Sequence, residues 1–344
     1  RPPSQASCVF ASERSSPGAT PQSAARRSSS ISALKKPEKC GSPARAITAQ
    51  AILKKGDLGW IKGRALGAGS FGTVSKALDP VALQVFAVKE VLLDSERCTC
   101  DKQRERLEVE LTICQSLRHP NIVSYLGHEC VGQSLLLFLE FVPGGSLASL
   151  VSDFGALEGA ALRKASTGIA QGLDYLHTRS PPVVHRDLKG ANVLVDLNLV
   201  AKLSDFGCSK WSSDTTSFTM LGSVPWMAPE VIDHGEGHGR SADIWSFGCT
   251  LIEIASAQKP WGNGAFDNML HALNRIASSD ETPPLPEGVP DECGELIARC
   301  TQRSPQRRPN TAELLQHTFL STVPGASRRQ SDVRARRASR CAQV

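Results

Sequence analysis

The 344-residue chain has few aromatic residues and no long apolar run. Aromatic residues make up 5% of it, so a buried core has to be built mainly from leucine, valine, isoleucine and alanine. The longest apolar run, residues 135–139, ends at Glu140. A membrane-spanning helix needs roughly 18 or more apolar residues, so no span is expected. The first residues contain no apolar signal core, and secretion is not expected either.

The chain also lacks paired cysteine motifs and an even spread of charge. Its eleven cysteines are an odd number without a C-x-x-C framework, which predicts reduced thiols and a cytoplasmic location, with access to the nucleus left open. The net charge of +5 divides into +8 for residues 1–55, +5 for residues 322–344 and −8 for residues 56–321. Because the basic charge lies at the two ends, we predict no nucleic-acid partner.

Sequence patterning divides the chain into three parts. Residues 1–55 are rich in Ser, Ala, Pro and Arg, and residues 322–344 are similar; both basic segments are predicted to be disordered, because they bury too little surface to offset their ordering entropy. Residues 56–321 form the predicted domain. Its first third contains strand-like runs at 73–78 and 83–88 around a turn at Asp79.

The rest of the predicted domain has helical spacing. Leu162, Ile169, Leu173 and Leu176 recur at intervals of three to four residues or their multiples, as on the buried face of a helix. Strands followed by helices predict an α+β fold with two lobes, a β-rich one and a helical one. A ligand is expected in the cleft between them.

Residues 67–72 contain the pattern G-x-G-x-x-G. A dinucleotide-binding fingerprint requires a helix directly after the glycines, and a Walker loop requires Gly-Lys-Ser/Thr. Here Thr73 and Val74 continue into a strand, and no lysine follows. A glycine-rich hairpin can bring backbone N–H groups close to phosphates, although glycine clusters also occur as plain turns.

Two charged residues occupy positions that favour burial. Lys89 lies on the strand after the glycine hairpin, where a water-facing lysine is the alternative interpretation. The next predicted helix, residues 104–117, has an apolar face of Leu107, Leu111, Cys114 and Leu117, and Glu110 falls in register with it. A carboxylate there is costly unless it is paired. We therefore predict a Lys89–Glu110 pair that orients Lys89 toward nucleotide phosphates.

The strongest signal is a polar segment between apolar runs. His185-Arg186-Asp187-Leu188-Lys189 leads to Asn192, and Asp205 follows thirteen residues later. Asp187 can accept the proton of an attacking hydroxyl group, and Lys189 can neutralise the transferred phosphoryl group. Asn192 and Asp205 supply the oxygen atoms that Mg²⁺ prefers.

Together these motifs resemble those of eukaryotic protein kinases over about residues 58–320. Further matches are Ala228-Pro229-Glu230, Asp243 and Arg308. The resemblance implies that Arg308 pairs with Glu230 and that Asp243 holds the backbone of the catalytic loop. It also implies ATP and Mg²⁺ as cofactors, Asp187, Lys189, Lys89 and Glu110 as catalytic residues, and Asn192 and Asp205 as metal ligands.

The same resemblance implies an ATP site. Leu139 would close the back of the adenine pocket, and Glu140, Phe141 and Val142 would form the hinge. The implied nucleotide-binding residues are Leu66, Gly67, Ala68, Gly69, Ser70, Phe71, Gly72, Val74, Ala87, Lys89, Leu139, Glu140, Val142 and Leu194.

Finer features resemble the MEKK-type mitogen-activated protein kinase kinase kinases. Lys189 and Ser223 are typical of serine/threonine kinases, and the strings at residues 60–63, 69–74, 118–123, 138–147 and 185–192 resemble this group. The resemblance implies that the protein substrate is a mitogen-activated protein kinase kinase, modified in its activation loop; no upstream activator can be identified. Alternatives are a neighbouring kinase group, a small-molecule kinase or a pseudokinase scaffold. The complete set of motif residues argues against the scaffold.

Two positions bear on substrate choice and switching. Pro225 stands where the group usually has tyrosine; because proline has no N–H and a fixed φ, the wall facing the substrate is expected to differ. Thr219 lies four residues before Ser223 and matches the group's main activating site. A phosphate on Thr219 is expected to pair with Arg186 and order the loop.

Overall fold

A computed structural model describes the patterned part of the chain. The residues described are 59–69, 72–92, 111–112, 114–205, 223–233, 239–266 and 268–321. The two terminal segments predicted from composition lie outside these ranges, as do Ser70, Phe71, Glu110 and Thr219. Within the ranges that are described, no helix combines the length and apolarity needed to cross a bilayer.

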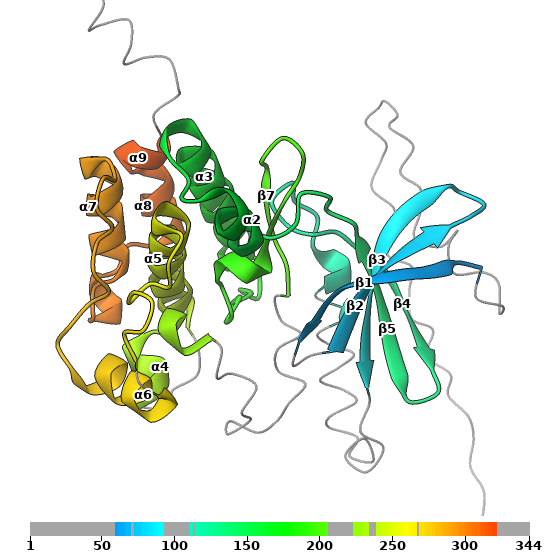
Figure 1. The fold of residues 1–344 in the computed structure, drawn as a ribbon, viewed down its shortest axis with the longest axis horizontal. Coiled ribbons are helices and arrows are strands. Elements are labelled where there is room, and N and C mark those ends of the chain that lie inside the picture. Colours follow the sequence, from blue (N-terminus) through cyan, green and yellow to red (C-terminus); the bar gives the residue numbers. More distant parts are fainter. Residues whose placement is uncertain are drawn as a thin grey trace, which may run out of the picture. The chain divides into compact units, whose positions relative to one another are not determined.

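The first half of the domain is a five-stranded antiparallel sheet (Figure 1). Its strands run in the order β1-β2-β3-β5-β4. They are β1 (Ile61–Gly69), β2 (Gly72–Asp79), β3 (Gln84–Leu92), β4 (Tyr125–Val131) and β5 (Ser134–Glu140). The predicted hairpin is confirmed as β2–β3, and its turn is held by Asp79, whose carboxylate accepts the N–H groups of Val81 and Ala82.

Strand register places four of the predicted nucleotide-binding residues on one face of the sheet. Val74, Lys89 and Leu137 lie opposite one another across β2, β3 and β5, and Lys76, Ala87 and Leu139 form the next such row. Directly opposed residues share a face of a sheet. On the other face, Phe86 and Phe138 pack edge to face with Trp60 in a separate apolar cluster.

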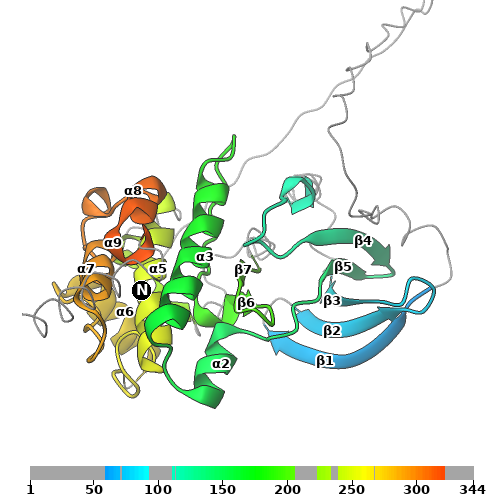
Figure 2. The same ribbon diagram turned by 90° about the horizontal axis from the view of Figure 1, so that it is seen from above.

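The second half of the domain is helical, as expected. α5 (Arg240–Ser256) is buried along most of its length and packs against α3 (Gly159–His177) and α7 (Asp291–Cys300) (Figures 1 and 2). The predicted apolar face of α3 is buried. The other helices are α2 (Leu147–Phe154), α4 (Pro229–Asp233), α6 (Met269–Ser278), α8 (Thr311–Gln316) and α9 (Thr318–Ser321), with 3₁₀ turns η2 (Gly190–Asn192) and η5 (Pro305–Arg307).

A two-stranded sheet joins these halves. β6 (Val193–Val195) and β7 (Ala201–Leu203) pair antiparallel beside α3. The Val123 N–H donates to the Leu203 carbonyl at 2.9 Å, and the Leu203 N–H donates to the Asn121 carbonyl at 2.9 Å. The segment that leads into β4 is therefore fixed to the strand that leads to Asp205.

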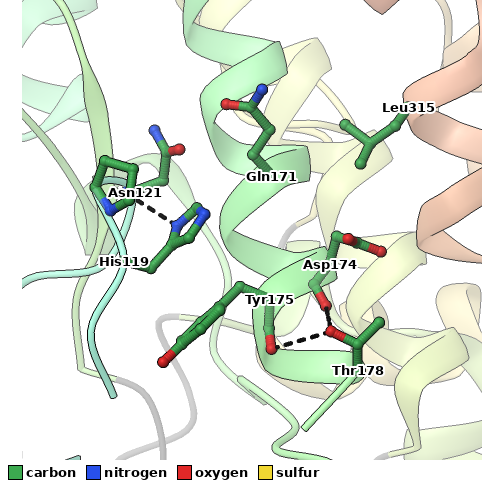
Figure 3. A pocket seen from close by; sticks show the side chains of 8 residues that line it. His119, Asn121, Gln171, Asp174, Tyr175, Thr178 and Leu315 are labelled. Atoms are coloured by element: carbon green, nitrogen blue, oxygen red, sulfur yellow. Dashed lines mark hydrogen bonds between the residues drawn. The ribbon is translucent and has the colours of Figure 1, made fainter. Parts of the chain in front are cut away.

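A second anchor of this segment is His119, which lines a hollow of about 390 Å³ (Figure 3). Its ring stacks on Tyr175 of α3 at 4.8 Å between centroids, and its Nδ1 accepts the Asn121 N–H at 3.2 Å. Gln171, Asp174 and Leu315 line the same hollow. None of the predicted catalytic or nucleotide-binding residues lines it.

The His119 contacts predict an acid-sensitive stability. Burial lowers the pKa of His119, partly opposed by Asp174. As the pH falls through 6.5, the unfolded chain takes up a proton that the folded chain resists, so stability is lost on the acid side. His119→Asn keeps an acceptor for the Asn121 N–H but cannot titrate. Its melting temperature is expected to fall less than that of the wild type between pH 7.5 and 5.5; an equal fall would refute this role.

Candidate active site

The described glycines of the motif lie at the paired ends of β1 and β2 rather than at the start of a helix. Gly69 pairs with Gly72 at the end of the ladder, and Gly67 lies opposite Val74. Gly72 has φ +117°, and a Cβ there would lie 1.9 Å from the Glu90 carbonyl oxygen, so the position requires glycine. Leu66 and Ala68 are exposed on β1. The arrangement is the glycine-rich hairpin predicted from the sequence.

Lys89 is buried in the interior of the site. Its side chain is 5% exposed, and its Nζ lies 2.5 Å from Asp205 Oδ1. The alternative interpretation, in which the Lys89 side chain faces water, is therefore wrong. Lys89 contacts Asp205, which the sequence predicts as a metal ligand. Its predicted partner Glu110 lies outside the described residues. The end of that predicted helix is described: residues 111–112 and 114–116 are helical, and Leu111, Cys114 and Leu117 are buried.

The polar segment after α3 places Asp187 at the centre of a hydrogen-bond network. Lys189 Nζ lies 3.0 and 2.9 Å from the two carboxylate oxygens of Asp187. The same Nζ donates to Ser223 Oγ at 2.6 Å. Asn192 Nδ2 donates to the carbonyl oxygen of Asp187 at 2.7 Å and to its Oδ2 at 2.8 Å. Four residues that sequence reasoning singled out thus meet within hydrogen-bond reach.

Asp243 of α5 holds the backbone of this segment, as the resemblance implied. Its carboxylate accepts the N–H groups of His185 at 2.8 Å and Arg186 at 2.9 Å. It also accepts a hydrogen bond from His177 Nε2 at 2.8 Å, a partner that sequence reasoning missed. Burial alone would raise the pKa of Asp243, but the bond from His177 and the other donors outweigh it and lower the pKa. Arg186 is held at φ +71°, which carries strain for a non-glycine residue.

Two hydrogen bonds to the backbone carbonyl of Asn192 bring the segments of Asn192 and Asp205 together. The Asn192 carbonyl accepts hydrogen bonds from the N–H and the hydroxyl group of Ser204, both at 2.9 Å, and Asp205 follows directly. Since Asn192 Nδ2 donates to Asp187, Asn192 Oδ1 is the atom of this side chain that could serve as a metal ligand, together with the Asp205 carboxylate. Two such oxygen ligands fit Mg²⁺, which usually takes one or two protein carboxylates plus phosphate and water. In the described ranges, no group of three or more His, Cys, Asp or Glu residues forms a metal site.

The predicted adenine site combines an apolar floor with backbone groups. Ala87 and Leu139 are paired across β3 and β5, and Leu194 is half-buried on β6. Val142 follows β5, and its backbone N–H and C=O have no hydrogen-bond partner among the residues described. The side chain of Glu140 forms an ion pair with Lys202 Nζ at 3.0 Å. Beside Lys89 and Asp205, Leu139 and Cys114 line a cavity of about 40 Å³.

A largely buried ion pair joins Arg308 to Glu230 of α4. Arg308 Nη1 and Nη2 bind the two oxygens of Glu230 at 2.6 and 2.8 Å, which confirms the predicted pair.

Sequence reasoning missed Glu253 of α5, which accepts the Gly190 N–H at 2.7 Å and Trp226 Nε1–H at 2.9 Å. Nothing local in the sequence distinguishes Glu253 from other helical glutamates.

The comparison with known proteins agrees with this geometry. The protein kinase domain family matches residues 60–320. Mitogen-activated protein kinase kinase kinase A of Dictyostelium discoideum is 39% identical over 278 residues, covering 79% of this chain and 29% of that protein. Mitogen-activated protein kinase kinase kinase YODA of Arabidopsis thaliana is 38% identical over 297 residues (86% and 33%), and mitogen-activated protein kinase kinase kinase 19 of Mus musculus is 39% identical over 271 residues (76% and 20%).

This chain therefore spans a third or less of the length of each of these three relatives. The similarity falls on the part that contains the glycine hairpin, Asp187, Asp205 and Arg308. Because the family match covers more than half of the chain, the chain belongs to the protein kinase family.

Proposed function

We propose that the chain is the catalytic domain of a mitogen-activated protein kinase kinase kinase, which transfers the γ-phosphoryl group of ATP to serine or threonine hydroxyl groups. The observation that carries this proposal is the contact set around Asp187, in which Lys189 Nζ bridges the carboxylate and Ser223 Oγ. The general base Asp187 and the Ser223 hydroxyl group thus both lie within hydrogen-bond distance of Lys189, the cation for the transferred phosphoryl group. Positioning and electrostatic stabilisation supply most of the catalysis in phosphoryl transfer.

The acceptor hydroxyl would donate its proton to Asp187 as its oxygen attacks the γ-phosphorus, while the bond from the γ-phosphorus to the oxygen that bridges to the β-phosphate breaks and ADP leaves. The Lys189 ammonium group would lie against the phosphoryl oxygens while charge is redistributed. Lys89 would bind the nucleotide phosphates, with Asp205 fixing its direction from 2.5 Å. Asn192 and Asp205 would hold Mg²⁺, which neutralises phosphate charge when bound. The adenine would lie between Ala87 and Leu194, with hydrogen bonds to the Val142 backbone.

The names of the relatives support the position in the cascade. Several relatives at 38–39% identity are named mitogen-activated protein kinase kinase kinases, so the proposed acceptor is the activation loop of a mitogen-activated protein kinase kinase.

Pro225 supports a substrate-facing surface that differs from that of the related kinases. It is buried, and its carbonyl oxygen accepts Trp261 Nε1–H at 3.2 Å, so the wall is fixed to the helical half without a donor at this position.

Phosphorylation in the presence of Mg·ATP tests this function. Wild-type protein and Asp187→Asn are offered a catalytically inactive mitogen-activated protein kinase kinase or a generic basic protein, and modified residues are located by mass spectrometry. Transfer to activation-loop Ser/Thr by the wild type alone is the expected result. Modification of the generic protein alone would retain the kinase and refute the cascade position. No transfer by protein that has nucleotide bound and its loop phosphorylated would refute the enzyme and favour the scaffold alternative.

Activation by phosphorylation of Thr219 is the switch that we propose for this enzyme. Thr219 lies outside the described residues, but its proposed partner Arg186 is described, and the buried Nε of Arg186 has no hydrogen-bond partner among the residues that the structure describes. A phosphate adds charge-assisted acceptors that pair well with arginine. Thr219→Ala is expected to lower transferase activity about tenfold or more, as for other loops ordered by phosphorylation. Full activity of this variant, with position 219 unmodified in the active wild type, would contradict the switch.

A further inference from the structure

Glu253 is a buried carboxylate that the proposed mechanism does not use. It lies on α5 among buried residues and is 8% exposed. Burial raises its pKa above the usual range, and the donors around it oppose this rise only in part. A buried carboxylate is costly unless hydrogen bonds compensate it. Its contacts therefore indicate which parts of the molecule it serves.

A single oxygen of Glu253 joins two separate segments. Oε2 accepts the Gly190 N–H at 2.7 Å and Trp226 Nε1–H at 2.9 Å. Gly190 directly follows Lys189, and Trp226 is the third residue after Ser223. Lys189 and Ser223 are themselves joined at 2.6 Å. The contacts form a closed ring that runs from Glu253 through Gly190 and Lys189 to Ser223 and back through Trp226.

The ring leaves little space for adjustment. A Cβ on Gly190 would lie 2.7 Å from Glu253 Oε1, so the backbone rests directly on the carboxylate. The carbonyl oxygen of Trp226 is held in addition by Ser246 Oγ–H at 2.8 Å. Both segments are therefore fixed to α5, the helix that also holds His185 and Arg186 through Asp243.

We propose that Glu253 is a positioning residue, which keeps the catalytic loop and residues 223–226 in one register so that Asp187 and Lys189 meet the acceptor hydroxyl. This inference rests on the proposed kinase activity. Glu253 touches neither nucleotide nor acceptor in this account. It acts through Gly190 and Trp226, and its loss displaces the groups that carry out the transfer. Displacements of about 1 Å can cost roughly 100-fold in rate.

Three variants separate positioning from simple stability. Glu253→Met removes the acceptor at similar length, whereas Glu253→Gln can keep one oxygen in place of Oε2. Trp226→Phe removes one donor and leaves the Gly190 bond. The matched control is Thr250→Val on the same helix, because the buried Thr250 hydroxyl donates to the Ser246 carbonyl at 2.7 Å and to no other group among the described residues. Each variant is assayed as the full chain for kcat, KM for the acceptor, Kd for ATP and melting temperature.

Glu253→Met is expected to lower kcat per folded molecule by about 10- to 100-fold, with an unchanged Kd for ATP. Glu253→Gln is expected to restore most of kcat, and Trp226→Phe to show a smaller loss than Glu253→Met. Thr250→Val should keep kcat whatever its melting temperature. The inference is overturned if Glu253→Met and Trp226→Phe lose no more kcat per folded molecule than Thr250→Val.

Amide hydrogen exchange provides a second readout that needs no catalysis. Residues 185–192 are expected to exchange faster in Glu253→Met and Trp226→Phe than in Thr250→Val, because the loop has lost a support. If the wild type is inactive, the proposed function is refuted. The exchange rates alone then test whether Glu253 holds the catalytic loop and residues 223–226 in register. Equal exchange then overturns the positioning role, and faster exchange supports it.

Discussion

Replacing Asp187 with asparagine is expected to lower the rate of phosphoryl transfer by about 10²- to 10⁴-fold, the range for loss of a general base. Asparagine has nearly the same shape but an amide group that does not accept the hydroxyl proton. Its NH₂ group would also face Lys189 Nζ or Asn192 Nδ2, which now donate to the carboxylate at 2.8 to 3.0 Å. The variant therefore loses both the base and the anchor of two neighbouring side chains.

Binding and folding are expected to survive this change. Asp187 is not among the predicted nucleotide-binding residues, so kcat should fall while Kd for ATP stays unchanged, the mark of an interaction made in the transition state. Single-turnover transfer and nucleotide titration measure the two quantities. Asp153→Asn is the matched control, since Asp153 is an exposed carboxylate on α2. A residual rate well above about one hundredth of the wild type, the limit set by the weakest general bases, would contradict the assignment.

Much of this site could be predicted because its residues are close in sequence. Asp187, Lys189 and Asn192 lie within six positions, so a single loop brings them together and the spacing reveals the chemistry. The glycine hairpin was equally predictable. Gly72 has a backbone conformation that side chains rarely adopt, and the strand-like residues after it exclude a helix.

The contacts that sequence reasoning missed come from distant positions. His177 meets Asp243 across 66 positions, and Glu253 meets Gly190 across 63. Both lie on helices whose apolar faces explain their folding without them. The Lys89–Glu110 pair stays a prediction, because Glu110 lies outside the described residues. The Lys89 contact that the structure does describe is with Asp205, 116 positions away, and sequence reasoning did not predict it. This contact depends on how β3 packs against the segment after β7, which no local pattern encodes.

Replacing Arg308 with lysine is expected to cost about 3 kcal/mol or more of folding stability, because at least two of its hydrogen bonds are lost and each hydrogen bond to a charged group contributes about 1.5–3 kcal/mol. All five N–H donors of its guanidinium are used: two bind Glu230 side by side at 2.6 and 2.8 Å, and the others bind the carbonyls of Gln302, Ser241 and Arg303 at 2.7 to 3.0 Å. Its guanidinium also lies 5.1 Å from the centre of the Trp245 ring. Lysine has three donors on a single atom and cannot reproduce this planar set.

The size of the effect follows from burial rather than from charge alone, and a second arginine tests that distinction. Arg275 binds Glu281 at 2.7 Å, but the side chains of this pair are 35% and 55% exposed. Arg275→Lys is therefore expected to cost less than about 1 kcal/mol. In thermal unfolding, about 1 kcal/mol shifts the midpoint by roughly 2–4 °C for 150–250 residues, so Arg308→Lys should lower it several times further than Arg275→Lys. Equal shifts would mean that the Arg308 pair adds no more than a surface contact. A large shift for Arg308→Lys alone would show that the buried Arg308–Glu230 pair stabilises the fold well beyond the contribution of a surface pair.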